Sequence, residues 1–184
     1  MSDQLLVLRG RVAARLGDNV DTDVIYPGRY LNITDREKTA EYLFELAYPE
    51  IRGKLRPGDF LVAGRNFGCG SSREQATAAL KFAGTGAVIA VSFARIFFRN
   101  SINLGLPAVV SPGAPAAIDE GDELELDLAA GAIRNLTKGV AIPAAPLDPR
   151  AVELLQAGGL IPYLKNKYAK RGQTHFSLPT AHLI

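Results

Sequence analysis

Residues 60–91 read FLVAGRNFGCGSSREQATAALKFAGTGAVIAV and carry three successive structural patterns. Residues 60–63 and 87–91 are short apolar runs of the kind that form strands buried on both faces. Between them, residues 71–82 place apolar side chains at helical spacing. The glycine-rich residues 64–70 join the first strand to this helix. The segment therefore predicts a strand, a loop, a helix and a second strand.

The chain continues with the same alternation. Residues 93–104 predict a second helix, and Gly105 follows as its C-terminal stop. Residues 108–110 are a third apolar strand. Strands that alternate with helices are typical of a parallel sheet covered by helices. We therefore predict an α/β fold with parallel core strands and flanking helices.

The N-terminal third adds a strand and a helix to this core. Residues 6–16 predict a first strand or strand pair, interrupted at Gly10. Residues 34–37 match a capping box, which opens an amphipathic helix that Pro49 ends. The apolar face of this helix would hold Ala40, Leu43, Phe44 and Ala47.

The C-terminal third has a different character. Residues 123–128 alternate strictly between polar and apolar, and residues 132–136 return after a turn, which predicts an antiparallel β-hairpin. Asp148 caps a last helix with Pro149 at its first position. We expect residues 164–184 to form a loosely held C-terminal tail.

Composition limits the class of protein. The 184 residues are 47% hydrophobic and 22% charged, which predicts one globular domain over residues 1–184. Lys and Arg exceed Asp and Glu by 21 − 19 = +2, spread along the chain, so we expect no nucleic-acid partner. The early apolar run at residues 5–8 is too short for a membrane span, so we expect no membrane association and a cytoplasmic protein. One Cys and two His predict no metal site built by this chain alone.

The loop of residues 64–74 carries the strongest chemical signal. Gly68 and Gly70 permit tight turns and the close approach of a ligand. The N-terminus of the following helix favours an anion, and Arg73 offers a planar pair of donors suited to a carboxylate. Ser71 and Ser72 add two hydroxyls at the same point. Together they predict a carboxylate site with a serine oxygen beside the ligand's carbon atoms.

A purely structural interpretation of the same residues is a capping box over Ser71–Glu74. A capping box needs neither the two glycines nor an arginine in the first helical turn, where positive charge is unfavourable. Cys69 could be a nucleophile or a small apolar filler. His175 and His182 are weak candidates for a general base because both lie in the last ten residues.

Three stretches together resemble the small subunits of the 3-isopropylmalate dehydratases, the separate swivel-domain chains of the aconitase superfamily. They are residues 66–74 (NFGCGSSRE), residues 92–100 (SFARIFFRN) and residues 18–31 (DNVDTDVIYPGRYL). The resemblance implies a swivelling β/β/α domain like the aconitase C-terminal domain. It also implies a large-subunit partner, in a heterodimer or heterotetramer, that carries a [4Fe–4S] cluster. A chain with one Cys cannot hold such a cluster alone.

The resemblance also implies a reaction and the residues that perform it. The family isomerises a small hydroxy dicarboxylic acid by removing and re-adding water. Matched to the family motifs, Ser71 is the base, acting as an alkoxide. Arg73 clamps a substrate carboxylate, Ser72 donates a hydrogen bond to it, and Gly70 lets the substrate approach. Asp23 matches an acidic site position that orients an arginine or a substrate hydroxyl, and an Asx turn is its structural alternative.

The residues after Leu31 bear on the substrate. In this family, apolar residues at this loop accompany isopropylmalate, whereas an arginine accompanies the extra carboxylate of homocitrate or homoaconitate. This chain has Asn32 and Ile33, and its nearest arginine, Arg36, is expected inside the next helix. An extra carboxylate without a cationic partner would be costly in a dry pocket. We therefore expect conversion of 2-isopropylmalate to 3-isopropylmalate in leucine biosynthesis, with homoaconitase and dimethylmalate or methylated-malate dehydratases as alternatives.

Two hypotheses of other classes stay open. A stand-alone carboxylate-binding regulatory module would need no partner, and a self-sufficient enzyme could use Cys69 as its nucleophile. The paired hydroxyls of Ser71 and Ser72 favour the hydro-lyase over a binding module. Arg95 and Arg99 lie four residues apart on the second predicted helix, and we expect them on a solvated or interface face, with substrate contact as the alternative.

Overall fold

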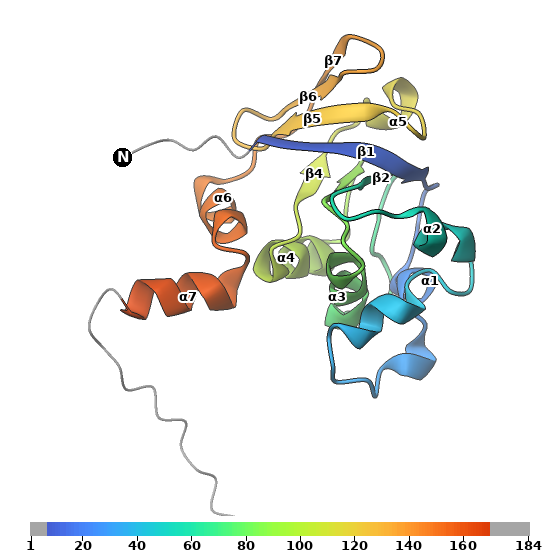
Figure 1. Cartoon of the computed structure of the whole chain (residues 1–184), viewed down its shortest axis with the longest axis vertical. Coiled ribbons are helices and arrows are strands. Elements are labelled where there is room, and N and C mark those ends of the chain that lie inside the picture. Colours follow the sequence, from blue (N-terminus) through green and yellow to red (C-terminus); the bar gives the residue numbers. More distant parts are fainter. Residues whose placement is uncertain (1–6, 170–184) are drawn as a thin grey trace, which may run out of the picture.

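Strand β1 (Val7–Arg15) is the centre of a seven-stranded sheet in the computed structural model, which describes residues 7–169. The strand order is β4-β3-β2-β1-β5-β6-β7 (Figure 1). The first half of β1 pairs antiparallel with β5 (Glu123–Asp127), and its second half pairs parallel with β2 (Phe60–Ala63). The expected interruption at Gly10 is wrong, because the strand runs through it. A Cβ there would lie 2.3 Å from the carbonyl oxygen of Gly58, so only glycine fits this close approach.

The parallel half of the sheet confirms the predicted α/β core. Its strands β1, β2, β3 (Ala87–Ala90) and β4 (Ala108–Val110) are parallel neighbours. Helix α3 (Glu74–Phe82) connects β2 to β3, and α4 (Arg95–Leu104) connects β3 to β4. Gly105 ends α4 in a left-handed conformation, as the sequence predicted.

Both faces of the parallel half are buried, which explains why its strands are wholly apolar. Leu61 and Ala63 belong to a core cluster with the buried residues of α3. Phe60 and Val62 point to the opposite face and join a second cluster, which includes Leu124 of β5. Side chains alternate along a strand, so each strand contributes to both clusters.

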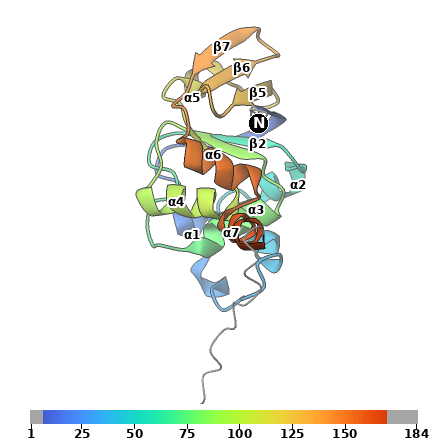
Figure 2. The same cartoon turned by 90° about the vertical axis from the view of Figure 1, so that its left-hand side faces the viewer.

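The antiparallel half contains one strand more than the sequence predicted. Strands β5 and β6 (Ala132–Asn135) form the expected hairpin, and β7 (Val140–Pro143) continues it as an edge strand. Only Ile142 of β7 is buried, so this strand shows little apolar periodicity. The three strands stack at the top of the molecule in Figure 2. A short helix, α5 (Ala114–Ala117), precedes β5.

The helix expected after residue 34 is wrong. Short helical turns stand in its place, and Phe44 has a φ of 53°, which no α-helix accommodates. Leu43 and Phe44 are buried as predicted, but Ala40 is only partly buried and Ala47 is exposed. Pro49 begins a helix instead of ending one, because proline suits a first helical position. The elements of this region are α1 (Thr22–Ile25), the 3₁₀ turns η1 (Gly28–Tyr30) and η2 (Lys38–Tyr42), and α2 (Pro49–Lys54).

Two helices close the described chain. In α6 (Pro149–Gln156), Asp148 accepts a hydrogen bond from the Arg150 backbone at 2.8 Å, which confirms the predicted cap. A further helix, α7 (Leu160–Ala169), was not predicted, and it projects to one side in Figure 1. Residues 164–169 are therefore helical where the sequence suggested a tail. Residues 170–184, with both histidines, lie outside the described residues.

Candidate active site

Three loops that are far apart in the sequence meet at one edge of the parallel sheet. They follow the carboxyl ends of β1, β2 and β3 and comprise residues 16–21, 64–73 and 91–94. In open α/β sheets, ligands bind outside the carboxyl ends of the strands. The three motifs of the sequence resemblance therefore come together where such sheets place their sites.

Backbone hydrogen bonds hold the glycine-rich loop between its two neighbours. The N–H of Gly68 donates to the carbonyl of Val20 at 2.8 Å, and the N–H of Phe67 donates to that of Ser92 at 3.0 Å. Gly68 and Gly70 have φ values of 76° and 86°, which favour glycine. The predicted need for glycine at both positions is thus confirmed.

The loop and the start of α4 enclose a cavity of about 430 Å³. Ser71, Ser72 and Arg73 line it on the loop side, together with Gly70. The residues of α4 that line the opposite side are Arg95, Ile96, Phe97, Arg99 and Asn100. Four of the predicted site residues thus share one cavity.

The guanidinium of Arg73, which lines the cavity, pairs with the carboxylate of Asp23, which does not line it. Asp23 Oδ1 also accepts a hydrogen bond from the N–H of Gly28 at 3.1 Å. The hydrogen bond from Arg73 holds the pKa of Asp23 below its ordinary value, against the opposing effect of desolvation. Asp23 is therefore ionised at neutral pH and restrains Arg73, whose side chain is only 16% exposed. This geometry supports the expectation that Asp23 orients an arginine.

The two serines do not cap helix α3, so the capping-box interpretation is wrong. The helix begins at Glu74, and Arg73 before it makes no side-chain capping hydrogen bond. Ser71 and Ser72 are exposed in the preceding loop. The hydroxyl of Thr22 donates to the carbonyl of Ser71 at 3.0 Å and so fixes the backbone of that residue. The serines are held at the cavity by the loop rather than by the helix.

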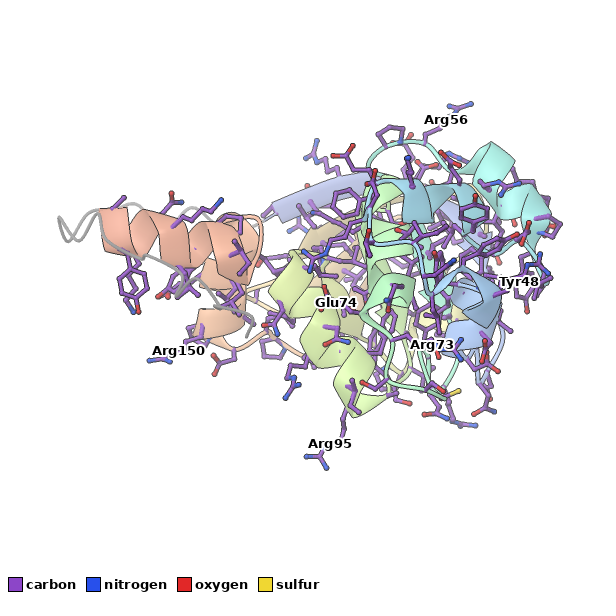
Figure 3. The ribbon with its side chains drawn as sticks, turned by 90° about the horizontal axis from the view of Figure 1, so that it is seen from below. Tyr48, Arg56, Arg73, Glu74, Arg95 and Arg150 are labelled. Atoms are coloured by element: carbon purple, nitrogen blue, oxygen red, sulfur yellow. The ribbon has the colours of Figure 1, made fainter. Side chains whose placement is uncertain are left out.

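Arg95 and Arg99 reach this cavity, which fits the less favoured sequence alternative of substrate contact. Both side chains are exposed, as expected, yet both line the same cavity as Arg73. Figure 3 shows Arg95 projecting from the start of α4. Their spacing of four residues placed them on one side of the helix. The sequence did not show that this side faces the glycine-rich loop.

Ile33 lines a second cavity, of about 260 Å³, that touches the start of α3. Leu31, Arg36 and Glu74 are among the other residues lining it. Arg36 pairs with Glu74 there, instead of lying inside a helix as predicted. Asn32 is exposed beside Ile33. The two cavities are adjacent, because Arg73 lines the first and the next residue, Glu74, lines the second. The structure therefore places the expected substrate loop next to the first cavity.

The remaining candidates contribute less to the cavity. Cys69 is a half-buried free thiol, whereas its neighbours Gly68 and Gly70 line the cavity. Within residues 7–169, no group of three or more His, Cys, Asp or Glu side chains is placed to hold a metal ion. No helix in the described part of the chain is both long and apolar enough to cross a membrane.

The fold and the cavity define a domain of the aconitase C-terminal class. The family model for the aconitase C-terminal domain matches residues 50–112. A crystal structure of 3-isopropylmalate dehydratase from Methanocaldococcus jannaschii superposes with a TM-score of 0.84 at 41% sequence identity. The match covers 92% of this chain and 100% of that chain, and it confirms the predicted fold class.

Curated relatives narrow the assignment. The 3-isopropylmalate dehydratase small subunit of Moorella thermoacetica is 49% identical over 88% of this chain and 97% of its own length. The isopropylmalate/citramalate isomerase small subunit of M. jannaschii is 50% identical over 89% of this chain and 97% of its own length. The homoaconitase small subunit of Methanothermobacter thermautotrophicus is 50% identical over 93% of this chain and 96% of its own length. The chain belongs to the family of 3-isopropylmalate dehydratase small subunits, as the sequence motifs predicted.

Proposed function

We propose that this chain is the small subunit of a two-chain hydro-lyase that converts 2-isopropylmalate to 3-isopropylmalate. The observation that carries the proposal is the placement of Ser71, Ser72 and Arg73 on one cavity, with Arg73 restrained by Asp23. The base takes a proton from a carbon next to a carboxylate, and hydroxide leaves the neighbouring carbon to give an unsaturated acid. Water then adds back with its hydroxyl on the other carbon, which completes the isomerisation.

Each residue has one role in this proposal. Ser71 takes the proton as an alkoxide, and Arg73 and Ser72 hold a substrate carboxylate. Asp23 keeps the guanidinium of Arg73 in place, and Gly70 leaves room for the substrate beside the backbone. An ordinary serine is too weakly acidic for this task, so nearby positive charge must favour its anion, and exclusion of water must strengthen the effect of that charge. Arg73 supplies charge, but Ser71 is exposed in the isolated chain.

The exposure of Ser71 to water supports a partner subunit that would cover it. We propose that a large subunit covers the cavity and carries the [4Fe–4S] cluster. The single Cys of this chain cannot hold a cluster, whose irons need several thiolate ligands. The composition of this chain thus does not fit the cluster, and the cluster's chemistry belongs to the partner. A cytoplasmic location follows from the same proposal, since reduced thiols persist there.

The second cavity supports an alkyl-substituted malate as substrate. Leu31 and Ile33 give it apolar surface, and its one arginine, Arg36, already pairs with Glu74. An additional substrate carboxylate would therefore find no unpaired cation among the residues lining this cavity. The homoaconitase and isopropylmalate/citramalate relatives keep homoaconitate and methylated malates as the alternative substrates.

Substitution of Ser71 tests the proposal. The chain and its large subunit are mixed, and turnover of 3-isopropylmalate is measured together with subunit affinity. Ser71→Ala should lower kcat by about 10²- to 10⁴-fold, the usual contribution of a general base, with unchanged subunit affinity. The matched variant Ser72→Ala should mainly raise KM, because Ser72 only holds the substrate. Turnover retained in Ser71→Ala would remove this serine from the mechanism.

A further inference from the structure

The cavity has more positive charge than the proposed chemistry uses. Three arginines line it, and none of its lining residues is Asp or Glu. The charge of Arg73 is offset by its ion pair with Asp23. Within residues 7–169, no ion pair joins Arg95 or Arg99 to a carboxylate. Two uncompensated positive charges therefore stand on the α4 side of the cavity.

The position of these two charges is unfavourable for the helix alone. Arg95 is the first residue of α4, and Arg99 lies one turn later. The first turn of α4 contains no acidic residue, so Arg95 lies at the positive end of the helix dipole, and Arg99 adds a like charge one turn away. The apolar neighbours Ile96 and Phe97 do not relieve this repulsion. A negatively charged ligand in the cavity would.

We infer that Arg95 and Arg99 form an anion-collecting rim that draws a doubly charged substrate into the cavity. The inference rests on the function proposed above, because a hydroxy dicarboxylate at neutral pH carries two negative charges. The rim attracts both carboxylates without a fixed contact, whereas Arg73 holds one of them. Clefts lined by one sign of charge raise the local concentration of an oppositely charged substrate. Arg95 and Arg99 are thus positioning residues, not catalytic ones.

The expected effect follows from screened electrostatics. At physiological ionic strength the Debye length is about 8 Å, comparable with the width of such a cavity. A unit charge at about this distance from a dianion changes its affinity by roughly two- to threefold. Removal of both charges should therefore raise KM about four- to tenfold and leave kcat nearly unchanged.

The experiment compares matched double variants of the chain, each reconstituted with the large subunit and assayed with 3-isopropylmalate. Arg95→Gln/Arg99→Gln removes the rim, and Arg56→Gln/Arg150→Gln removes the same net charge elsewhere. Arg56 and Arg150 are exposed, and Figure 3 shows them on other sides of the molecule. Arg95→Lys/Arg99→Lys keeps the charge but changes the donor geometry.

We expect only the first variant to raise KM, and we expect its KM to depend less on salt than that of the wild type. The lysine variant should retain the wild-type KM. An unchanged KM in Arg95→Gln/Arg99→Gln overturns the inference while the proposed function stands. Weaker subunit association with an unchanged KM at saturating large subunit also overturns it, because the rim would then serve docking. A wild-type pair inactive on every hydroxy dicarboxylate refutes the proposed function itself.

Discussion

Replacing Gly68 with alanine tests whether the glycine-rich loop and α4 form one packed wall beneath the cavity. Gly68 has a φ of 76°, and a Cβ there would lie 2.1 Å from Cγ of Phe97. Phe97 is 2% exposed, and its ring packs edge-on against Phe67 with 5.2 Å between the ring centroids. The new methyl group would therefore overlap a buried ring, which must shift to admit it.

The expected destabilisation has two parts. The left-handed conformation costs an alanine about 1–2 kcal/mol. Forcing extra volume against the buried ring of Phe97 costs about 1–3 kcal/mol more. Gly68→Ala should therefore lower the free energy of unfolding by about 2–5 kcal/mol, which corresponds to a fall in Tm of roughly 5–15 °C for a chain of this size. Turnover should fall as well, because Phe97 and its neighbours on α4 line the cavity.

Alanine variants at two other glycines separate the conformational cost from the packing cost. Gly121 has a φ of 92° and open space around a Cβ, so Gly121→Ala shows the conformational cost alone, about 1–2 kcal/mol. Gly53 lies inside α2 with an ordinary φ and open space, so Gly53→Ala should stabilise the protein by about 0.5–1 kcal/mol. Thermal and urea unfolding of the three variants measure these values.

The expected clash depends on the side chain at position 97. Phe97→Ala removes Cγ and the ring atoms that the new methyl group meets, so the stability losses of Phe97→Ala and Gly68→Ala should combine to less than their sum. An additive double variant, or a Gly68→Ala loss no larger than that of Gly121→Ala, would refute the idea of a packed wall.

Three other outcomes follow from the site. Asp23→Asn should raise KM about tenfold or less and shift the free energy of unfolding by under about 1 kcal/mol, because the Asp23–Arg73 pair is partly exposed. Since Arg73 lowers the pKa of Asp23, the pair's contribution is fully present above the ordinary carboxyl pKa of about 4 and is lost only as pH falls through the lowered value. The pH–rate profiles of the wild type and of Asp23→Asn should therefore have the same shape from pH 5 to 8. Cys69→Ala should keep kcat within about twofold, since the thiol has no role in the proposed reaction. Inactivation of this variant would instead support the hypothesis that Cys69 is the nucleophile. Asn32→Arg should raise activity on a homologous tricarboxylate by about tenfold, and no gain would disconnect this loop from the substrate.

The sequence predicted the parallel core because local and tertiary signals agree there. Residues 60–63 are apolar at every position since both faces of β2 are covered, and the same holds for β3. The hairpin was also predictable, because Leu124 and Leu126 are buried while Glu123 is exposed. These strands form where their own side-chain pattern directs them.

The errors occur where contacts distant in sequence override the local pattern. Phe44 donates its N–H to the carbonyl of Ile25 at 2.9 Å, and this bond with a φ of 53° breaks the amphipathic helix that the sequence favours. The serines matched a capping box, but the hydroxyl of Thr22 holds the carbonyl of Ser71 and the helix begins three residues later. Neither partner could be identified from spacing along the chain.

Under the proposed function, the exposure of Ser71 accounts for the need for a second chain. A hydroxyl that faces water keeps its proton at neutral pH, because a serine is a very weak acid and the high dielectric constant of water weakens the field of Arg73. A rigid single chain could bury this serine permanently, but it would then close the path by which a dianion enters past Arg95 and Arg99. A site that is open in the isolated chain and covered in the complex allows both the entry of the substrate and the exclusion of water from Ser71. The open cavity of about 430 Å³ and the restrained arginine beside it are what such a half-site requires.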